Sequence, residues 1–358
     1  MTKALPILSA LLASAALHLS PATAGEAGTR DILVPSESRQ RDLAVTIWYP
    51  SAGGGERVMV GENRVFAGSP ALADAKPAEG SYPLVVLSHG SGSTVKGMAW
   101  LAGALASAGY VVAGPNHPGT TSGHSTPADT PKIWERTDDL STLVSALEAD
   151  PQWGKLIDTS AIGVVGFSLG GAAAMEFAGA TASLEDYARY CETYPAMADC
   201  NWFAGGTAYV DKTLVAVDPL DLRTVDKARF EQSNRDSRLK SAVLVDPSVA
   251  RAFDADSLKN IEIPMSFINL GQSGTVPVSV EAADLARLTP NGTHAYVADA
   301  VHYSFLPQCT PEAKPFLQSV DETDPICDDP GPRTRADIHA ELVTLITSAF
   351  DRTLKPAK

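Results

Sequence analysis

Short, wholly apolar runs recur along this chain, and helical patterns separate them. The clearest four runs are PLVVL at residues 83–87, YVVA at 110–113, IGVV at 162–165 and AVLV at 242–245. Strands that are apolar on both sides are typical of a parallel sheet buried between two layers of helices. The alternation therefore predicts the α/β class, with a mostly parallel sheet and helices on both of its faces.

Other segments complete this pattern. Three further strands are expected at residues 43–49, 263–270 and 293–297, and helices at 98–108, 133–147, 172–178 and 338–354. The stretch from Pro50 to Ser81 is polar and rich in Ala, Gly and Pro, so no strand is assigned to it. Residues 181–240 interrupt the alternation.

The first 24 residues have the pattern of a secretory signal peptide. Lys3 supplies a positive charge, residues 4–19 are mostly apolar, and Ala22-Thr23-Ala24 is a small-x-small cleavage site. We therefore expect an exported protein, periplasmic or extracellular. No later segment approaches the ~20 continuous apolar residues of a membrane-spanning helix, so no transmembrane segment is expected.

Composition excludes some classes of partner. The 358 residues include 28 Lys and Arg against 42 Asp and Glu, for a formal net charge of -14. This excess of negative charge disfavours nucleic acid as a partner. Hydrophobic residues make up 44% of the chain, enough for a full core.

The four cysteines predict two disulfides, because their number is even and the chain is expected in an oxidising compartment. Three pairings are possible, and closeness along the chain favours Cys191 with Cys200 and Cys309 with Cys327. No C-x-x-C pair is present, so no metal site is expected.

The sequence Gly166-Phe167-Ser168-Leu169-Gly170 follows one of the buried strands and precedes a helix of small residues. A G-x-S-x-G segment in this context is typical of a nucleophile elbow, a sharp turn that lifts a serine hydroxyl above the sheet. We therefore predict that Ser168 is a catalytic nucleophile. The alternative is an ordinary turn between strand and helix.

A nucleophilic serine needs a histidine base, which in this motif order follows it along the chain. Only His294, His302 and His339 qualify. His302 comes just after the strand at 293–297, at the carboxyl edge of the sheet where site residues gather. His294 begins that strand at the opposite edge, and His339 falls in the last helix. His302 is the predicted base.

The base in turn needs a carboxylate to orient it. Asp246 directly follows the strand at residues 242–245, whereas the segment after the next strand, residues 270–277, contains no acid. Position and elimination therefore favour Asp246. Asp299 is the alternative, but it lies only three residues from His302.

Acyl transfer also needs two N–H donors for a developing oxyanion. The backbone N–H of Leu169 is the first predicted donor. The loop His89-Gly90-Ser91-Gly92 has the form that supplies the second, which we assign to the Ser91 N–H. His89 is then a structural residue of the loop.

Together the segments RDLAVTIWYP, LSHGSG, GFSLGG, AVLVDP and VADAVHYSF resemble the α/β-hydrolase superfamily. More narrowly, they resemble the exported group of predicted dienelactone hydrolases, which is similar to platelet-activating-factor acetylhydrolases. The resemblance covers roughly residues 43–354. It implies a serine esterase without a metal or an organic cofactor, with its triad acid at Asp246.

Two departures limit this resemblance. True dienelactone hydrolases use a cysteine nucleophile, so their lactone substrate is not carried over. Cutinase-like polyester hydrolases place the acid after the following strand, where this chain has Gln272-Ser273-Gly274. The expected reaction is hydrolysis of a small or lipid-like carboxylic ester through an acyl-enzyme. An amidase or peptidase of the same fold, or a binding protein without catalysis, are the alternatives.

Residues 25–358 are expected to form one domain with a cap insertion at about 181–240. Six aromatic residues gather at positions 181–209, and they either line an apolar substrate pocket or build a small satellite core. His117 and His124 flank the loop after residues 110–113 and are expected as histidines of a surface loop, with contact to the substrate as the alternative. A cluster of four aspartates near Cys327 is expected to be a solvated acidic surface rather than a calcium site: Asp321, Asp324, Asp328 and Asp329.

Overall fold

A computed structural model describes residues 25–355, so the predicted signal peptide lies outside the described residues. Ten strands form the main sheet, in the order β14-β13-β12-β9-β5-β6-β2-β1-β4-β3. The strands from β14 to β6 run parallel to one another, and β2 joins β6 in the antiparallel direction. The predicted, mostly parallel sheet is confirmed.

The strands of the main sheet are β1 (Gly28–Ser36), β2 (Arg41–Tyr49), β3 (Glu56–Val60), β4 (Ser69–Ala73), β5 (Tyr82–Ser88), β6 (Val111–Pro115), β9 (Ile157–Phe167), β12 (Leu239–Val245), β13 (Met265–Leu270) and β14 (Gly292–Val297). The larger helices are α1 (Ala99–Ser107), α2 (Ile133–Ala149), α4 (Leu169–Ala178), α5 (Leu184–Thr193) and α11 (Arg335–Thr353).

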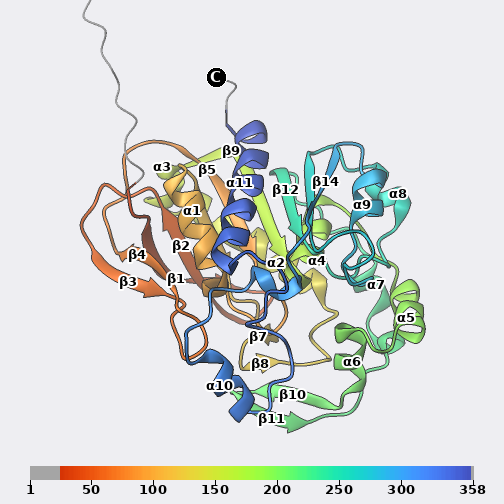
Figure 1. The fold of residues 1–358 in the computed structure, drawn as a ribbon. Coiled ribbons are helices and arrows are strands. Elements are labelled where there is room, and N and C mark those ends of the chain that lie inside the picture. Colours follow the sequence, from red (N-terminus) through yellow and green to blue (C-terminus); the bar gives the residue numbers. More distant parts are fainter. Residues whose placement is uncertain (1–24, 356–358) are drawn as a thin grey trace, which may run out of the picture.

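Helices cover both faces of the sheet (Figure 1). Alternate residues of β5 point to opposite sides, as the two-residue period of a strand requires. Leu84 and Val86 belong to the core that also contains residues of α2, whereas Val85 and Leu87 pack with residues of α1 and α11. Both sides of the central strands are thus buried, which is why their sequences are wholly apolar.

The expected strands and helices are all present, with small shifts at their ends. Three strands before residue 81 were not expected, namely β1, β3 and β4. The expectation that residues 50–81 hold no strand is therefore wrong. In β3 and β4 most side chains are only partly buried or exposed, because these strands lie at the edge of the sheet. A continuous apolar run, the signal used for the central strands, is absent from them.

The predicted cap at 181–240 largely leaves the main sheet, to which it returns at Leu239, the first residue of β12, and it builds a layer at one edge of the molecule (Figure 1). It contains α5, α6 (Ala198–Ala204), α7 (Lys227–Phe230) and the hairpin of β10 (Thr207–Val210) and β11 (Thr213–Ala216). The hairpin extends a small second sheet with β7 (Thr120–Thr121) and β8 (His124–Ser125), both from the loop after β6.

Candidate active site

Ser168 lies on a sharp turn between β9 and α4. Its backbone has φ 54° and ψ -121°, a conformation that costs free energy for a residue with a side chain. A Cβ at Gly170 would lie 1.9 Å from the Ser88 carbonyl oxygen, and one at Gly166 would lie 2.1 Å from the Gly170 oxygen. The glycines on either side are thus required by close packing, and the strained turn exposes the serine at the carboxyl end of the strand.

His302 and Asp246 converge on this serine from two other strand ends. Asp246 directly follows β12, and His302 begins the short helix η3 (His302–Phe305) after β14. The His302 Nε2 atom lies 3.2 Å from Ser168 Oγ, and His302 Nδ1 lies 2.9 Å from Asp246 Oδ2. The structure therefore brings together the three residues that the sequence predicts as a triad.

The hydrogen bonds around Asp246 determine where the protons lie. Asp246 is fully buried, and its Oδ1 atom accepts hydrogen bonds from the Leu270 N–H and the Asn269 amide, at 2.9 and 2.8 Å. Donors at Oδ1 stabilise the carboxylate, which accepts the Nδ1 proton of His302 at its other oxygen. The Nε2 atom is then free to accept the proton of the Ser168 hydroxyl.

Asn269 was not identified from the sequence. Besides Asp246, its amide group donates to the Val280 carbonyl, and its Oδ1 atom accepts from the Ala282 N–H and from His294 Nε2. Every polar atom of this buried side chain is therefore engaged, which fixes its orientation. His294 does not reach the serine, as expected, but it supports the residue that holds Asp246.

Ser248 is a second residue that sequence reasoning missed. Its Oγ atom lies 3.3 Å from Ser168 Oγ, and its N–H donates to the Ser168 carbonyl oxygen at 3.0 Å. The only sequence signal is its place two residues after Asp246, on the loop that leaves β12. Ser248 thus places a second hydroxyl group beside the Ser168 hydroxyl.

The two predicted oxyanion donors lie on segments that adjoin Ser168. Leu169 is the first residue of α4, so its N–H is one of the four that an α-helix leaves without an intrahelical partner. The loop of Ser91 approaches the serine closely, because a Cβ at Gly90 would lie 3.3 Å from Ser168 Cβ. Ser91 itself is exposed. Both segments therefore border the space above the Ser168 hydroxyl.

Aromatic rings form a wall behind His302. Phe167 stacks on the His302 ring and on Phe305, with centroid distances of 4.8 and 4.2 Å. Trp100 donates from its ring nitrogen to the Phe305 carbonyl, and His339 of α11 stacks on Trp100 at 3.7 Å. Burial lowers the pKa of His339 to about 4, so this histidine is neutral and serves the packing of η3.

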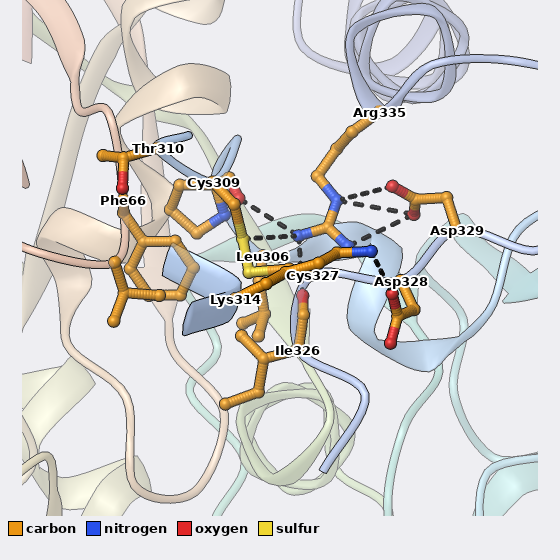
Figure 2. Close-up of a disulfide and its surroundings, with 12 residues drawn as sticks. Phe66, Leu306, Cys309, Thr310, Lys314, Ile326, Cys327, Asp328, Asp329 and Arg335 are labelled. Carbon is orange, nitrogen blue, oxygen red and sulfur yellow. Dashed lines mark hydrogen bonds and ion pairs between the residues drawn. A yellow bond between two sulfur atoms is a disulfide. The ribbon is translucent and has the colours of Figure 1, made fainter. Parts of the chain in front are cut away.

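The segment after η3 is tied down by a disulfide and an arginine (Figure 2). Cys309 is bonded to Cys327, and Arg335 donates to the Asp329 carboxylate and to the Ile326 carbonyl. Asp329 also accepts a hydrogen bond from Ser304, which lies inside η3. The second disulfide joins Cys191 to Cys200. The pairing favoured by the sequence is therefore confirmed for both bonds.

The expectation of a solvated acidic surface holds only in part. Asp321 and Asp324 are exposed, and Asp328 is exposed while paired with Lys314. The Asp329 side chain is only 15% exposed and pairs with Arg335. Because Asp329 pairs with a buried arginine, it stabilises the structure of this segment and is not a surface charge.

The expectation for His117 is wrong. His117 is fully buried and bonded on both ring nitrogens, whereas His124 is partly exposed as expected. The sequence shows a loop rich in Gly, Thr and Ser, but it does not show that this loop folds inward between β5 and α2. His89 is fully buried as well, in agreement with a structural role.

The aromatic residues of the predicted cap mainly build a satellite core. Tyr187, Tyr190 and Phe203 are buried in a cluster that includes Cys200 and Leu169 of α4. Tyr194 and Tyr209 are more than a third exposed. Of the two interpretations left open, the structure thus favours the satellite core for the three buried rings, and this core extends to the residue next to Ser168.

Within residues 25–355, no helix is long and apolar enough to cross a membrane. The same residues contain no group of three or more His, Cys, Asp or Glu side chains arranged to bind a metal ion.

Comparison with known proteins identifies the family. The family described as serine aminopeptidase, S33, matches residues 81–269. Among solved structures, a ferulic acid esterase from Streptomyces cinnamoneus is similar, with a TM-score of 0.61 and 22% identity over 95% of this chain and 94% of that one. A dienelactone hydrolase from Anabaena variabilis has a TM-score of 0.48 and 14% identity, over 92% of this chain and 100% of that one.

No curated protein matches this chain. At 22% identity, the likeness to the ferulic acid esterase shows the fold alone. The family match covers more than half of the chain, including β5, the turn at Ser168 and the strand before Asp246. The chain is therefore a hydrolase that belongs to the serine aminopeptidase S33 family of the α/β-hydrolase superfamily.

Proposed function

We propose that this protein is a serine esterase that hydrolyses carboxylic esters by means of Ser168, His302 and Asp246. The observation that carries this proposal is the aligned pair of contacts at His302, 3.2 Å to Ser168 Oγ on one side and 2.9 Å to Asp246 Oδ2 on the other. A serine held in a strained turn beside an oriented histidine is the arrangement that nucleophilic catalysis requires.

In the first half of the reaction, Ser168 Oγ attacks the acyl carbon while its proton moves to His302 Nε2. The electron pair of the carbonyl double bond moves onto the oxygen, which the N–H groups of Leu169 and Ser91 stabilise. Collapse of this intermediate breaks the bond to the alcohol oxygen, and the proton on His302 goes to that alcohol. The product is an acyl-enzyme on Ser168.

In the second half, a water molecule gives a proton to His302 and attacks the acyl carbon. Collapse of the second intermediate breaks the bond to Ser168 Oγ, which recovers the proton from His302, and the free acid leaves. Asp246 stays ionised throughout and stabilises the imidazolium form of His302. The reaction consumes one water and needs no metal or organic cofactor.

The substrate class is a small or lipid-like ester. This class is the one that the resemblance to acetylhydrolases implies. An apolar residue, Leu169, lies beside the nucleophile, where it joins the buried core of residues 181–240. We propose that these residues are a cap within a single domain of residues 25–358, because they share this buried core with α4. The two disulfides agree with a signal peptide at residues 1–24 and delivery to the periplasm or the extracellular space.

A second candidate is hydrolysis of amides, which the description of the matching family as a serine aminopeptidase favours. The same acyl-enzyme chemistry serves both reactions, and only the leaving group differs. The third possibility is a binding protein that has the same fold but does not catalyse a reaction. The strained turn at Ser168 argues against it, because binding alone does not require that strain.

The test is a matched set of p-nitrophenyl esters, acetate through palmitate, and the corresponding p-nitroanilides. We expect the protein to hydrolyse the esters faster than the anilides, and the Ser168→Ala variant to lose this activity. An optimum at a given acyl length would measure the depth of the acyl pocket. Turnover of anilides alone would favour the amidase, and equal ester rates for both proteins would refute the triad.

A further inference from the structure

A second Ser-His-Asp array lies inside the protein. Ser88 Oγ is 3.0 Å from His117 Nε2, and His117 Nδ1 is 2.8 Å from Asp139 Oδ2. The side chains come from the end of β5, the loop after β6 and the middle of α2. All three residues are fully buried, so no substrate reaches this serine and the array is not a second nucleophilic site.

The bonds of this array assign its protons. Arg39 donates to both carboxylate oxygens of Asp139, at 2.8 Å each, and these bonds favour the ionised carboxylate against the burial that raises the pKa of Asp139. His117 Nδ1 therefore carries the proton donated to Asp139, and Nε2 accepts the hydroxyl proton of Ser88. Burial and the charge of Arg136 lower the pKa of His117 well below its ordinary value, in agreement with a neutral ring.

The array continues directly into the loop of the predicted oxyanion donor. The His117 N–H donates to His89 Nε2 at 3.1 Å, so His89 carries its proton on Nδ1 and donates it to the Gly90 carbonyl at 2.7 Å. Arg136 donates to the His89 carbonyl and to Ser88 Oγ. The carbonyl groups of His89 and Gly90 immediately precede Ser91. The first accepts a hydrogen bond from Arg136, which also bonds Ser88, and the second accepts one from the His89 ring, which the His117 N–H holds.

The far side of the loop is bonded in the same way. The Gly92 N–H donates to the Thr120 carbonyl at 2.9 Å, and the Thr120 hydroxyl accepts from Arg136 at 2.7 Å. Ser91 therefore lies between two points that the same buried arginine holds. The peptide plane that presents the Ser91 N–H is restrained from both ends.

Stability alone does not account for such a cluster. Arg39, Arg136 and Asp139 are all mostly or fully buried, and apolar side chains of similar volume usually stabilise a core at least as well as buried charges do. What charged and directional bonds add is a single backbone geometry, and stabilisation of an oxyanion depends on such geometry at the level of fractions of an ångström.

We propose that the His117 ring is a positioning group that, through its bond to Ser88, fixes the Gly90–Ser91 backbone for binding of the oxyanion. The bond from the His117 N–H to His89 belongs to the backbone and is kept in every His117 variant. The inference rests on the proposed serine hydrolase chemistry, but not on the ester as substrate. It assigns a function to a histidine that lies outside the triad.

The test measures the rate at which a fluorophosphonate probe labels Ser168, followed by intact mass. Phosphonylation also develops negative charge on an oxygen that the oxyanion donors bind. We compare the unmodified protein with His117→Ala, with His117→Gln, whose amide oxygen can accept from Ser88, and with His124→Ala as a surface control on the same loop. His117→Ala is expected to label roughly 10- to 100-fold more slowly.

The pattern across variants distinguishes positioning from a structural role. We expect His117→Gln to recover much of the labelling rate, His124→Ala to match the unmodified protein, and the midpoint of the pH profile to stay unchanged, because His302 and Asp246 are untouched. With esters, kcat is expected to fall while KM changes less than about threefold. Normal labelling in folded His117→Ala, or a shifted pH midpoint, would overturn the proposal.

Two further outcomes are separable. If His117→Ala does not fold, as judged by far-ultraviolet circular dichroism, Ser88→Ala removes a single oxygen and decides the question with the same labelling assay, for which we expect a loss of about tenfold. If the unmodified protein is labelled but hydrolyses no ester, only the substrate assignment fails. If Ser168 of the unmodified protein is not labelled at all, both proposals fail.

Discussion

Asp246 combines three features that suit the acid of a triad. It is fully buried, its φ of 44° lies in the left-handed region, and one oxygen faces His302 while the other accepts two hydrogen bonds. Asp299, the alternative acid, pairs instead with Arg333. The sequence favoured Asp246 over Asp299 because Asp246 directly follows a strand. The contact of Asp246 with His302 and the pairing of Asp299 with Arg333 agree with that preference.

We therefore predict that Asp246→Asn lowers kcat by about 10³- to 10⁴-fold, because the amide favours the wrong tautomer of His302. Asp299→Asn is the matched control and is expected to leave kcat within about twofold of the unmodified protein, since Asp299 does not face the histidine. Steady-state hydrolysis of a p-nitrophenyl ester measures both. A large loss in Asp299→Asn with little effect in Asp246→Asn would reverse the assignment.

The residues proposed as the triad could be identified from the sequence because each follows a strand that the sequence predicts. The residues that contact this triad, Asn269 and Ser248, could not be identified in this way. Asn269 occupies the end of β13 and Ser248 follows Asp246, and nothing in either local sequence marks a contact that only the folded sheet creates. His117 was misjudged for the same reason, because burial of a polar loop depends on a partner, Asp139, that lies 22 positions away.

At the scale of the element, α4 carries an unusual buried acid. Glu176 is 1% exposed and accepts one hydrogen bond, from Asn234 at 2.7 Å. Burial raises the pKa of the Glu176 carboxyl to about 8. The folded protein therefore keeps this group protonated at neutral pH, whereas the unfolded chain ionises it near its ordinary value of about 4.3.

The sign of the resulting pH dependence follows from proton binding. Between about pH 4.3 and 8 the native state binds one more proton at Glu176 than the unfolded state does, so the free energy of unfolding decreases as pH rises. Within this window, Glu176 is expected to lower the free energy of unfolding by about 1.4 kcal/mol for each pH unit of increase. Glu176→Gln cannot ionise, so we expect this decrease to be absent in the variant. The variant should gain stability relative to the unmodified protein on going from pH 5.5 to pH 7.5.

Urea unfolding at both pH values measures this change, with the exposed Glu37→Gln as control. A difference in unfolding free energy between Glu176→Gln and the unmodified protein that is the same at pH 5.5 and 7.5 would contradict the raised pKa of Glu176.

The elements themselves show which sequence signals are sufficient. The buried strands β5, β6, β9 and β12 appear where the apolar runs predict them. The missed strands β1, β3 and β4 form the outer part of the sheet. Along β1, exposed residues alternate with buried or partly buried ones, which gives no continuous apolar run.

At the scale of the whole molecule, the two disulfides close loops in different places. One lies within the layer of residues 181–240, and the other joins segments beyond η3, next to the Arg335 and Asp329 pair. Their sequence separations are 9 and 18. In the chain-entropy account, the longer loop contributes more to the free energy of unfolding, by about 0.6 kcal/mol for a doubled length.

We predict that replacing Cys309 and Cys327 by serine lowers the free energy of unfolding by about 3 kcal/mol, and somewhat more than the same change at Cys191 and Cys200. Denaturant titration of the two double variants and the unmodified protein provides the comparison. Removal of the Cys309–Cys327 bond is also expected to reduce kcat more, because that segment anchors Ser304 through Asp329. A larger loss of kcat in the Cys191 and Cys200 variant would contradict this view of the site.

The central claim is that Ser168 carries the acyl group during turnover. The most direct measurement mixes the protein with excess p-nitrophenyl ester, quenches with acid within the first turnovers, and locates the added acyl mass by peptide mapping. We predict one acyl group on the peptide that contains Ser168, and none on it in Ser168→Ala. An acyl group on another residue, or ester hydrolysis that persists in Ser168→Ala, would contradict the account.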